Sequence, residues 1–508
     1  MIRSRTPVSL WAPAVLSAAV SLVPLAYLAV QAGARGWSLV VDEILQRRTL
    51  DLAVRSLLLT AAVTAASAML GVFAAWAVTL AGLRMRLPLT ILFSFPLAIP
   101  SYLAAFAWIS WRPGLAGFVG AFIVLTFACF PYVMLPVVAA LSRMDPLHED
   151  VARSLGTSGP LVFVRVVLPQ VRRAATAGSL LVALYALSDF GAPAAMRHEV
   201  FTWVIYGAYR AGFNPARAAI LSLVLVGLAL LLTAGERTAR GRIVTNRTEA
   251  GSGRSRPRPG ARVRALAYAG SAAILLPSIG VPVASIVSWL SRDNSRGVDW
   301  GTVRSAASAS FGIGVLAAAA ALLAALPVAL LAVRHRGRFA GLVEASTWVT
   351  HALPGIVVAI SVVYVGIRAV RPLYQEIPMV VFAHVVLFLP VMVTALKAAI
   401  EKSAPGTEEV ARTLGAGPVA VFLRVTLPVA LPGIVAGFAL VMLAAVKELP
   451  ATLLLRPTGL DTVSTRIWDF STVSDWASVG PFALAILLLA AVPTAILGTL
   501  SAVKESSR

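Results

Sequence analysis

Cysteine and charged residues are scarce in this 508-residue chain. Cys129 is the only cysteine, which excludes an internal disulfide, a cysteine-rich zinc site and an iron–sulfur cluster held by this chain alone. Charged residues make up 13% of the sequence and apolar residues 59%, with a mean hydropathy of +0.86. A soluble helical protein of this composition would have no polar face left for water, so a set of soluble domains is excluded.

The sequence also lacks the signatures of an enzyme. None of its four lysines lies in a G-x-x-x-x-G-K-[ST] phosphate-binding loop, so we do not expect this chain to hydrolyse ATP. Its five histidines are scattered, and no cluster of intramembrane nucleophiles, bases or metal ligands is visible. A net charge of +21 would suggest nucleic acid as the partner of a soluble protein. Here the basic residues flank apolar runs, so we expect contact with the lipid bilayer and no nucleic-acid partner.

Long apolar runs dominate what is present. A helix of about 20 residues crosses the roughly 30 Å hydrocarbon core of a bilayer. By this criterion the sequence predicts an all-α polytopic membrane protein. About twelve spans are expected, at residues 10–32, 53–80, 87–110, 114–141, 173–196, 216–236, 265–290, 305–333, 340–366, 377–400, 433–455 and 478–502.

The distribution of arginine predicts which side of the membrane each connection faces. If both termini are cytoplasmic, every strongly basic segment lies on the cytoplasmic side. One of these segments, residues 237–263, is rich in Gly, Ser, Pro and Arg and is predicted to be a flexible linker. It separates a first half, residues 1–236, from a second half, residues 264–508. Because each half has an even number of spans, the halves are expected to be parallel repeats.

One predicted cytoplasmic loop occurs twice. Residues 149–169 read EDVARSLGTSGPLVFVRVVLP, and residues 408–428 read EEVARTLGAGPVAVFLRVTLP. The copies lie 259 residues apart and agree without a gap at 12 of 21 positions. Each copy falls between the fourth and fifth spans of its half. Two near-identical loops in otherwise diverged halves indicate a partner that docks twice.

The first copy carries the signals of a short helix. Asp145 is the expected N-cap, with Pro146 at the first helical position. Val151 and Leu155 are four residues apart and therefore share a face. Gly156 is expected to end the helix in a left-handed conformation.

A second short apolar helix is expected to follow Pro160 and to end at Leu168-Pro169, before the next span. The alternative for both loops is an amphipathic helix that rests on lipid headgroups, with its arginines touching phosphates: Arg153, Arg165, Arg412 and Arg424. Membrane contact alone would not require the near-identity of the two copies, so the pattern favours docking.

The order of an acidic residue, a small residue, a glycine and a terminal Leu-Pro resembles the EAA loop of the permeases of binding-protein-dependent ABC importers. The two loops would then cover residues 145–169 and 404–428. Val151 and Val410 replace the first alanine of the motif, and Asp150 replaces its glutamate in one copy. In that family the loop is a coupling helix seated in a groove of the ATPase subunit. The resemblance implies these docking residues: Asp150, Ala152, Gly156, Pro169, Glu409, Ala411, Gly415 and Pro428.

The same resemblance implies the wider setting. The fold would be that of a type I ABC importer permease (MetI-like), in a bacterial inner membrane. Two copies of an ATPase subunit and a periplasmic substrate-binding protein would be its partners. ATP and Mg would be bound by the ATPase subunits, and no cofactor by this chain.

Charged residues inside membrane spans are costly and tend to be functional. Asp189, Lys447 and Glu448 are therefore candidates for the translocation pathway or gate. Alternatively, Lys447 and Glu448 form a local pair or anchor an unwound segment before Pro450. Five prolines interrupt predicted spans and are candidates for kinks along a path, although helix packing explains them equally well: Pro96, Pro100, Pro131, Pro354 and Pro390.

The stretches SDFGAPA, from Ser188, and KELPATLLLRP, from Lys447, resemble those of ferric-iron importer permeases. Thiamine and aminophosphonate permeases carry similar stretches, so they remain alternatives to ferric iron as the predicted substrate. An ion-coupled secondary transporter with six-plus-six repeats would explain the number of spans but not the twin loops. A membrane scaffold without transport activity would leave the loops unexplained as well.

Overall fold

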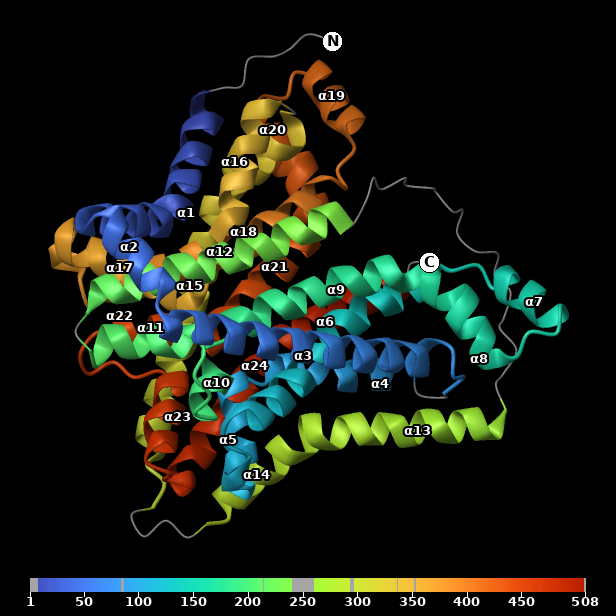
Figure 1. Ribbon diagram of the computed structural model, residues 1–508. Helices are drawn as coiled ribbons and strands as arrows, with labels where there is room; N and C mark the ends of the chain where they lie inside the picture. The colour runs from blue at the N-terminus through green and yellow to red at the C-terminus, as the bar shows by residue number, and fades with distance from the viewer. Residues whose placement is uncertain are drawn as a thin grey trace. The chain divides into compact units, whose positions relative to one another are not determined.

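The computed structural model describes residues 8–83, 86–212, 214–239, 260–292, 297–335, 337–350 and 353–506. The described residues form helices and connections and contain no strand (Figure 1). The chain divides into two compact units. We call them the α6 unit (Gln46–Val204 and Val224–Ser288) and the α18 unit (Met1–Leu45, Ile205–Leu223 and Trp289–Arg508).

Three long helices form the centre of the α6 unit: α3 (Arg47–Thr79), α6 (Phe118–Arg143) and α9 (Leu168–Ser188). Gly178 allows α9 to lie close to α6, because a Cβ atom at this position would be 2.6 Å from both the carbonyl oxygen of Tyr132 and the Cα of Val133. The unit also contains α4 (Arg86–Ser94), α5 (Ser101–Trp111), α7 (Leu147–Ser154), α8 (Gly159–Val162), α10 (Gly191–Ala195) and α13 (Ala261–Leu275).

The α18 unit has the equivalent centre: α15 (Trp300–Arg334), α18 (Ile377–Ile400) and α21 (Leu427–Lys447). Gly437, 259 residues after Gly178, also lies close to α18: a Cβ atom there would be 2.8 Å from the Cβ of Ala395. The unit also contains α1 (Val8–Arg35), α2 (Trp37–Leu45), α16 (Arg338–Val349), α17 (Gly355–Arg368), α19 (Pro405–Thr413), α20 (Pro418–Val421), α22 (Pro450–Leu455), α23 (Val463–Thr472) and α24 (Trp476–Ser506). Three helices continue from one unit into the other: α11 (Phe201–Arg210), α12 (Pro215–Ala239) and α14 (Val281–Leu290).

The compact units do not follow the order of the sequence. Helix α1, at the start of the chain, packs against α15, α16 and α17 of the α18 unit, whereas α13 contacts α3 of the α6 unit. The division into residues 1–236, 237–263 and 264–508 concerns the sequence repeat and stays a prediction. Most of its linker, residues 240–259, lies outside the described residues.

Eight helical stretches of the described chain are long and apolar enough to cross a membrane, and a bent pair of helices makes a possible ninth. These nine coincide with nine of the twelve predicted spans. The other three predicted spans are also helical, but they are divided or their apolar helices are shorter: α9 with α10, α16 with α17, and the apolar part of α24. The prediction of an all-α polytopic membrane protein is confirmed. Of the twelve predicted spans, nine are long and apolar enough to cross a membrane, and three do not meet this criterion.

The prolines act in two different ways. At Pro96 and Pro100 the predicted span breaks, and the helical pair Arg86–Ala98 and Ser101–Trp111 bends by 90°. Pro354 stands at the N-cap of α17, at the start of another short helix. Pro131 and Pro390, in contrast, lie inside the continuous helices α6 and α18. The expectation that prolines interrupt the spans is therefore confirmed at Pro96, Pro100 and Pro354 only.

Candidate functional site

The first repeated loop begins with helix α7. The Asp145 carboxylate accepts a hydrogen bond from the backbone N–H of Leu147 at 3.0 Å. Pro146 stands at the N-cap position, so the helix begins one residue later than predicted, while Asp145 still acts as a side-chain acceptor at its start. In the second copy, α19 begins directly at Pro405.

Both short helices end in the same left-handed turn. The φ angles of Gly156 and Gly415 are +79° and +88°. After Gly156, the N–H of Thr157 reaches back to the carbonyl of Ala152, and the N–H of Ala416 does the same to Ala411, each at 3.1 Å. This is a Schellman motif, in which a glycine adopts the left-handed conformation at low cost. The glycine-ended helix that the sequence predicts is present in both copies.

The apolar face of each helix is exposed. The side chains of Leu155 and Leu414 are 80% and 83% exposed, and those of Val151 and Val410 are at least half exposed. In each copy a valine and a leucine four residues apart form an apolar ridge, as the spacing predicts. Exposed leucines of this kind at the tip of a short polar helix suit insertion into an apolar groove of another molecule.

The acidic residue that each loop buries is not the one that the motif singles out. Asp150 is partly exposed and pairs with Arg153 at 3.5 Å, and Glu409 is exposed. The preceding residues, Glu149 and Glu408, are only 2% and 4% exposed. The sequence pattern does not predict burial of either residue. The available signal was that both copies have glutamate at this position, whereas the next position varies between Asp and Glu.

The segment that follows each short helix differs from the prediction. After α8, residues Phe163–Val167 form a π-helical turn that leads directly into α9, and Phe422–Thr426 do the same before α21. Pro169 is therefore near the start of α9, instead of at the end of a separate short helix, and Pro428 stands in the same place in α21. Because proline has no N–H for the regular bond four residues back, a wider π turn fits just before it.

The charged residues of the predicted spans lie at two equivalent helix breaks. Asp189 ends α9, and its carboxylate accepts bonds from the Ser101 hydroxyl at 2.7 Å and from the Ala192 N–H at 2.9 Å. Glu448 ends α21 and accepts bonds from the Ala451 N–H at 2.9 Å.

Glu448 has further neighbours in the α18 unit. The N–H and the hydroxyl of Thr452 donate to its carboxylate at 3.0 and 3.1 Å. The Nε2 atom of His384, on α18, is 3.7 Å away. Lys447 is the last residue of α21 and is partly buried. The two carboxylates thus hold the first turn of the short helices α10 and α22, which fits the alternative of an anchored break, and their place in a pathway stays a proposal.

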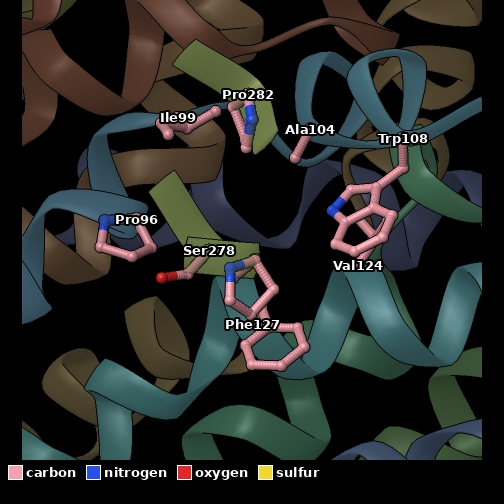
Figure 2. A pocket seen from close by; sticks show the side chains of 10 residues that line it. Pro96, Ile99, Ala104, Trp108, Val124, Phe127, Ser278 and Pro282 are labelled. Carbon is pink, nitrogen blue, oxygen red and sulfur yellow. The ribbon is translucent and has the colours of Figure 1, made fainter. Parts of the chain in front are cut away.

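A pocket of the α6 unit lies at the break between α4 and α5 (Figure 2). None of its lining residues is ionisable, and its single hydroxyl, on Ser278, donates to the carbonyl of Ile274 at 2.7 Å. The pocket is lined by Pro96, Ile99, Ala104, Trp108, Val124, Phe127, Ala128, Pro277, Ser278 and Pro282. It offers no charge for an ion. Among the described residues, no three His, Cys, Asp or Glu side chains lie close enough together to hold a metal ion.

Comparisons with known proteins match both halves of the chain. The model of the family described as "Binding-protein-dependent transport system inner membrane component" matches residues 67–235 and again residues 309–503. Each match contains one copy of the repeated loop.

The individual proteins that the chain resembles are also permeases of transport systems. The chain is similar to the Fe(3+)-transport system permease protein FbpB 2 of Haemophilus influenzae, with 33% identity over 481 residues, which cover 94% of this chain and 95% of the relative. It is 28% identical over 233 residues to the sulfate transport system permease protein CysT of Escherichia coli, covering 42% of this chain and 84% of the relative. It is also 34% identical over 142 residues to the molybdenum transport system permease protein ModB of Mycobacterium tuberculosis, covering 26% and 54%.

Proposed function

Because this chain belongs to the family of inner membrane components of binding-protein-dependent transport systems, we propose that it is the permease of an ATP-driven importer and that it transports ferric iron. The observation that carries the proposal is the pair of glycine-ended helices, α7 and α19, each with an exposed apolar ridge. Two equivalent docking helices require two copies of the docked subunit. We place one ATPase subunit, with its ATP and Mg, on each loop.

The contacts of Arg153 and Arg412, two of the four loop arginines, favour docking over rest on lipid headgroups. Arg153 donates to Glu149 at 3.0 Å, and Arg412 donates to Glu408 at 3.4 Å. These two guanidinium groups are thus paired within the loops, although their side chains stay 42% and 55% exposed. A helix that rests on lipid headgroups would direct its arginines to phosphates instead of to its own glutamate.

The choice of ferric iron rests on the extent of similarity. The relative named for Fe(3+) transport matches 94% of this chain, while the sulfate and molybdenum relatives match 42% and 26%. This favours iron over the thiamine and aminophosphonate alternatives. Family membership likewise disfavours an ion-coupled secondary transporter. In the proposed arrangement both loops and both termini are cytoplasmic, and a periplasmic binding protein delivers the iron on the other side.

Asp189, Lys447 and Glu448 are proposed to contribute to the pathway or its gate. Capping a short helix needs only a neutral acceptor such as Asn, Ser or Thr. An ionised carboxylate at membrane depth is costlier than a neutral cap, so its charge is expected to have a use beyond capping.

Uptake of radiolabelled ferric iron by a strain that lacks this chain tests the function. Iron uptake is expected to fall in the deletion strain and to return when this chain is supplied again, but not if its ATPase is also deleted, while thiamine uptake, the control, stays unchanged. Iron uptake that persists after ATP depletion but collapses with the proton gradient would instead support a secondary transporter.

A further inference from the structure

Glu408 is the most enclosed charged residue of the second loop, with 4% of its surface exposed. Helix α19 is otherwise largely exposed, yet the Glu408 side chain turns into the α18 unit and accepts several hydrogen bonds. The hydroxyl of Thr426 donates at 2.8 Å and that of Ser403 at 3.3 Å, and the guanidinium of Arg334 forms a short ion pair with it. A buried carboxylate with this many donors is held in one position.

The partners of Glu408 come from different elements of the unit. Arg334 is the last residue of α15, Ser403 follows α18, and Thr426 is the last residue of the π-helical turn before α21. Arg334 also donates to the carbonyl oxygens of Ile400 and Ser403, at 3.3 and 3.2 Å. The pair therefore joins α19 to the ends of all three central helices of the unit.

Charge and burial make this junction stiff. The side chain of Arg334 is largely buried, and water competes little with its pairing to Glu408. Removing one member of such a pair leaves the other charge desolvated without its counter-ion. A contact between apolar surfaces can slide, whereas directional bonds to several elements fix the register between them.

The first copy has a similar buried acid but a different chemical setting. Glu149 accepts a hydrogen bond from Arg153 at 3.0 Å. The positions that correspond to Thr426 and Ser403 hold Val167 and Met144, whose side chains cannot donate hydroxyl hydrogen bonds. The hydroxyl donors are thus a property of the second loop.

We propose that Glu408 and Arg334 are positioning residues that transmit movement from α19 to the membrane helices α15, α18 and α21. This inference rests on the proposed function, in which an ATPase subunit moves α19. The apolar ridge, Val410 and Leu414, contacts the ATPase, and Glu408, on the inward side of the same helix, carries the displacement into the membrane. The motif acid, Glu409, does not enter this junction.

The test uses the complete complex of this chain, its ATPase and its binding protein in proteoliposomes. Radiolabelled ferric iron uptake and ATP hydrolysis are measured together, which gives iron transported per ATP. For Glu408→Gln we expect the ATPase to remain bound and to hydrolyse ATP, while iron per ATP falls by at least about tenfold, within the range typical of coupling between sites. Glu401→Gln is the matched control, because Glu401 is an exposed glutamate of the same connection and is expected to transport normally.

Variants of Arg334 separate transmission from simple structural support. Arg334→Met is expected to lower iron per ATP as Glu408→Gln does, and the double variant is expected to be no worse than either single one, since the two residues act as a unit. Arg334→Lys keeps a cation beside Glu408 and is expected to recover at least half of the lost yield.

Two results would overturn the inference. One is a normal iron yield in Glu408→Gln. The other is loss of ATPase binding and hydrolysis together with uptake in both Glu408→Gln and Arg334→Met, which would make the pair a purely structural one. ATPase binding and iron uptake of the wild-type chain are measured first. A wild-type chain that neither binds an ATPase nor moves iron would refute the proposed function instead of this inference.

Discussion

Asp189 and Glu448, 259 residues apart, make the same hydrogen bond: each carboxylate accepts from the backbone N–H three residues later, Ala192 or Ala451, at 2.9 Å. Each of them ends a long helix of its half and holds the start of a short one. The sequence repeat therefore extends beyond the docking loops to a charged helix break in each half.

This relationship gives a first prediction, in which charge is removed but a capping acceptor is kept. Asp189→Asn and Glu448→Gln are each expected to leave the thermal midpoint within about 2 °C of wild type, because an amide oxygen still accepts from the backbone. Iron uptake is expected to fall by about tenfold or more if the charge belongs to the pathway.

Glu376→Gln is the matched control for these two variants. Glu376 precedes α18, is exposed and makes no side-chain capping bond. It is expected to behave as wild type. Normal uptake in Asp189→Asn and Glu448→Gln would show that both carboxylates act only as helix caps.

The second prediction concerns the apolar ridges. Leu155→Asp combined with Leu414→Asp is expected to abolish co-purification of the ATPase, since burial of each leucine contributes roughly 2 kcal/mol and an aspartate would have to be desolvated. Both side chains are more than three-quarters exposed, so insertion and folding of the permease should persist.

Val473→Asp provides the comparison for the leucine variants. Val473 is an apolar residue of similar exposure, 74%, between α23 and α24 and outside both loops. This variant is expected to retain the ATPase. If the double leucine variant also retained it, the ridges would not be the docking surface.

The third prediction concerns the left-handed glycines. Gly156→Val and Gly415→Val are expected to reduce ATPase binding and iron uptake strongly, because a side chain in the left-handed region costs roughly 1–2 kcal/mol and would unwind the end of the docking helix. Nothing lies within 4 Å of a Cβ at either position, so the effect would come from the backbone and not from a clash.

Gly459 allows this backbone effect to be tested outside the loops. Its φ angle is +84°, its surroundings are equally open, and it lies between α22 and α23. Gly459→Val carries a comparable strain and is expected to retain ATPase binding. Equal loss of ATPase binding in all three variants would indicate general destabilisation.

The fourth prediction is a pH dependence at the start of α15. The Asp299 carboxylate accepts bonds from the hydroxyl and the N–H of Thr302 and from the N–H of Gly301, and these bonds lower the pKa of Asp299. A lowered folded-state pKa means that the stabilisation is present above the unfolded value of about 3.9 and is lost as the pH falls through the folded value.

Thermal unfolding in detergent measures this effect. Between about pH 5 and about pH 3, the midpoint of the wild-type chain is expected to fall further than that of Asp299→Asn, in which the cap does not titrate. Identical pH profiles for the two chains would contradict the role of the ionised carboxylate.

Much of the site could be predicted from the sequence because it depends on local rules. The spacing of Val151 and Leu155 and the place of Gly156 follow from helix geometry and backbone sterics alone, and both hold in the structure. The same signals repeat at Val410, Leu414 and Gly415.

The buried acid could not be derived in this way. Glu408 and Glu409 are neighbours about 100° apart around one helix, and which of them turns inward depends on where α15 ends and on Arg334, 74 residues earlier. The start of α9 at Leu168 was missed for a related reason. The wider turn that joins it to α8 is a local departure from regular helix geometry that a Leu-Pro ending does not reveal.

Site-specific photo-cross-linking in native membranes identifies the molecule that contacts the apolar ridges of α7 and α19. A photoreactive amino acid is placed at position 155 or at position 414, and the cross-linked product is identified by mass spectrometry. We expect a product with the ATP-hydrolysing subunit from both positions, and none from position 473. Products formed only with lipid, or with the ATPase from neither loop, would contradict it.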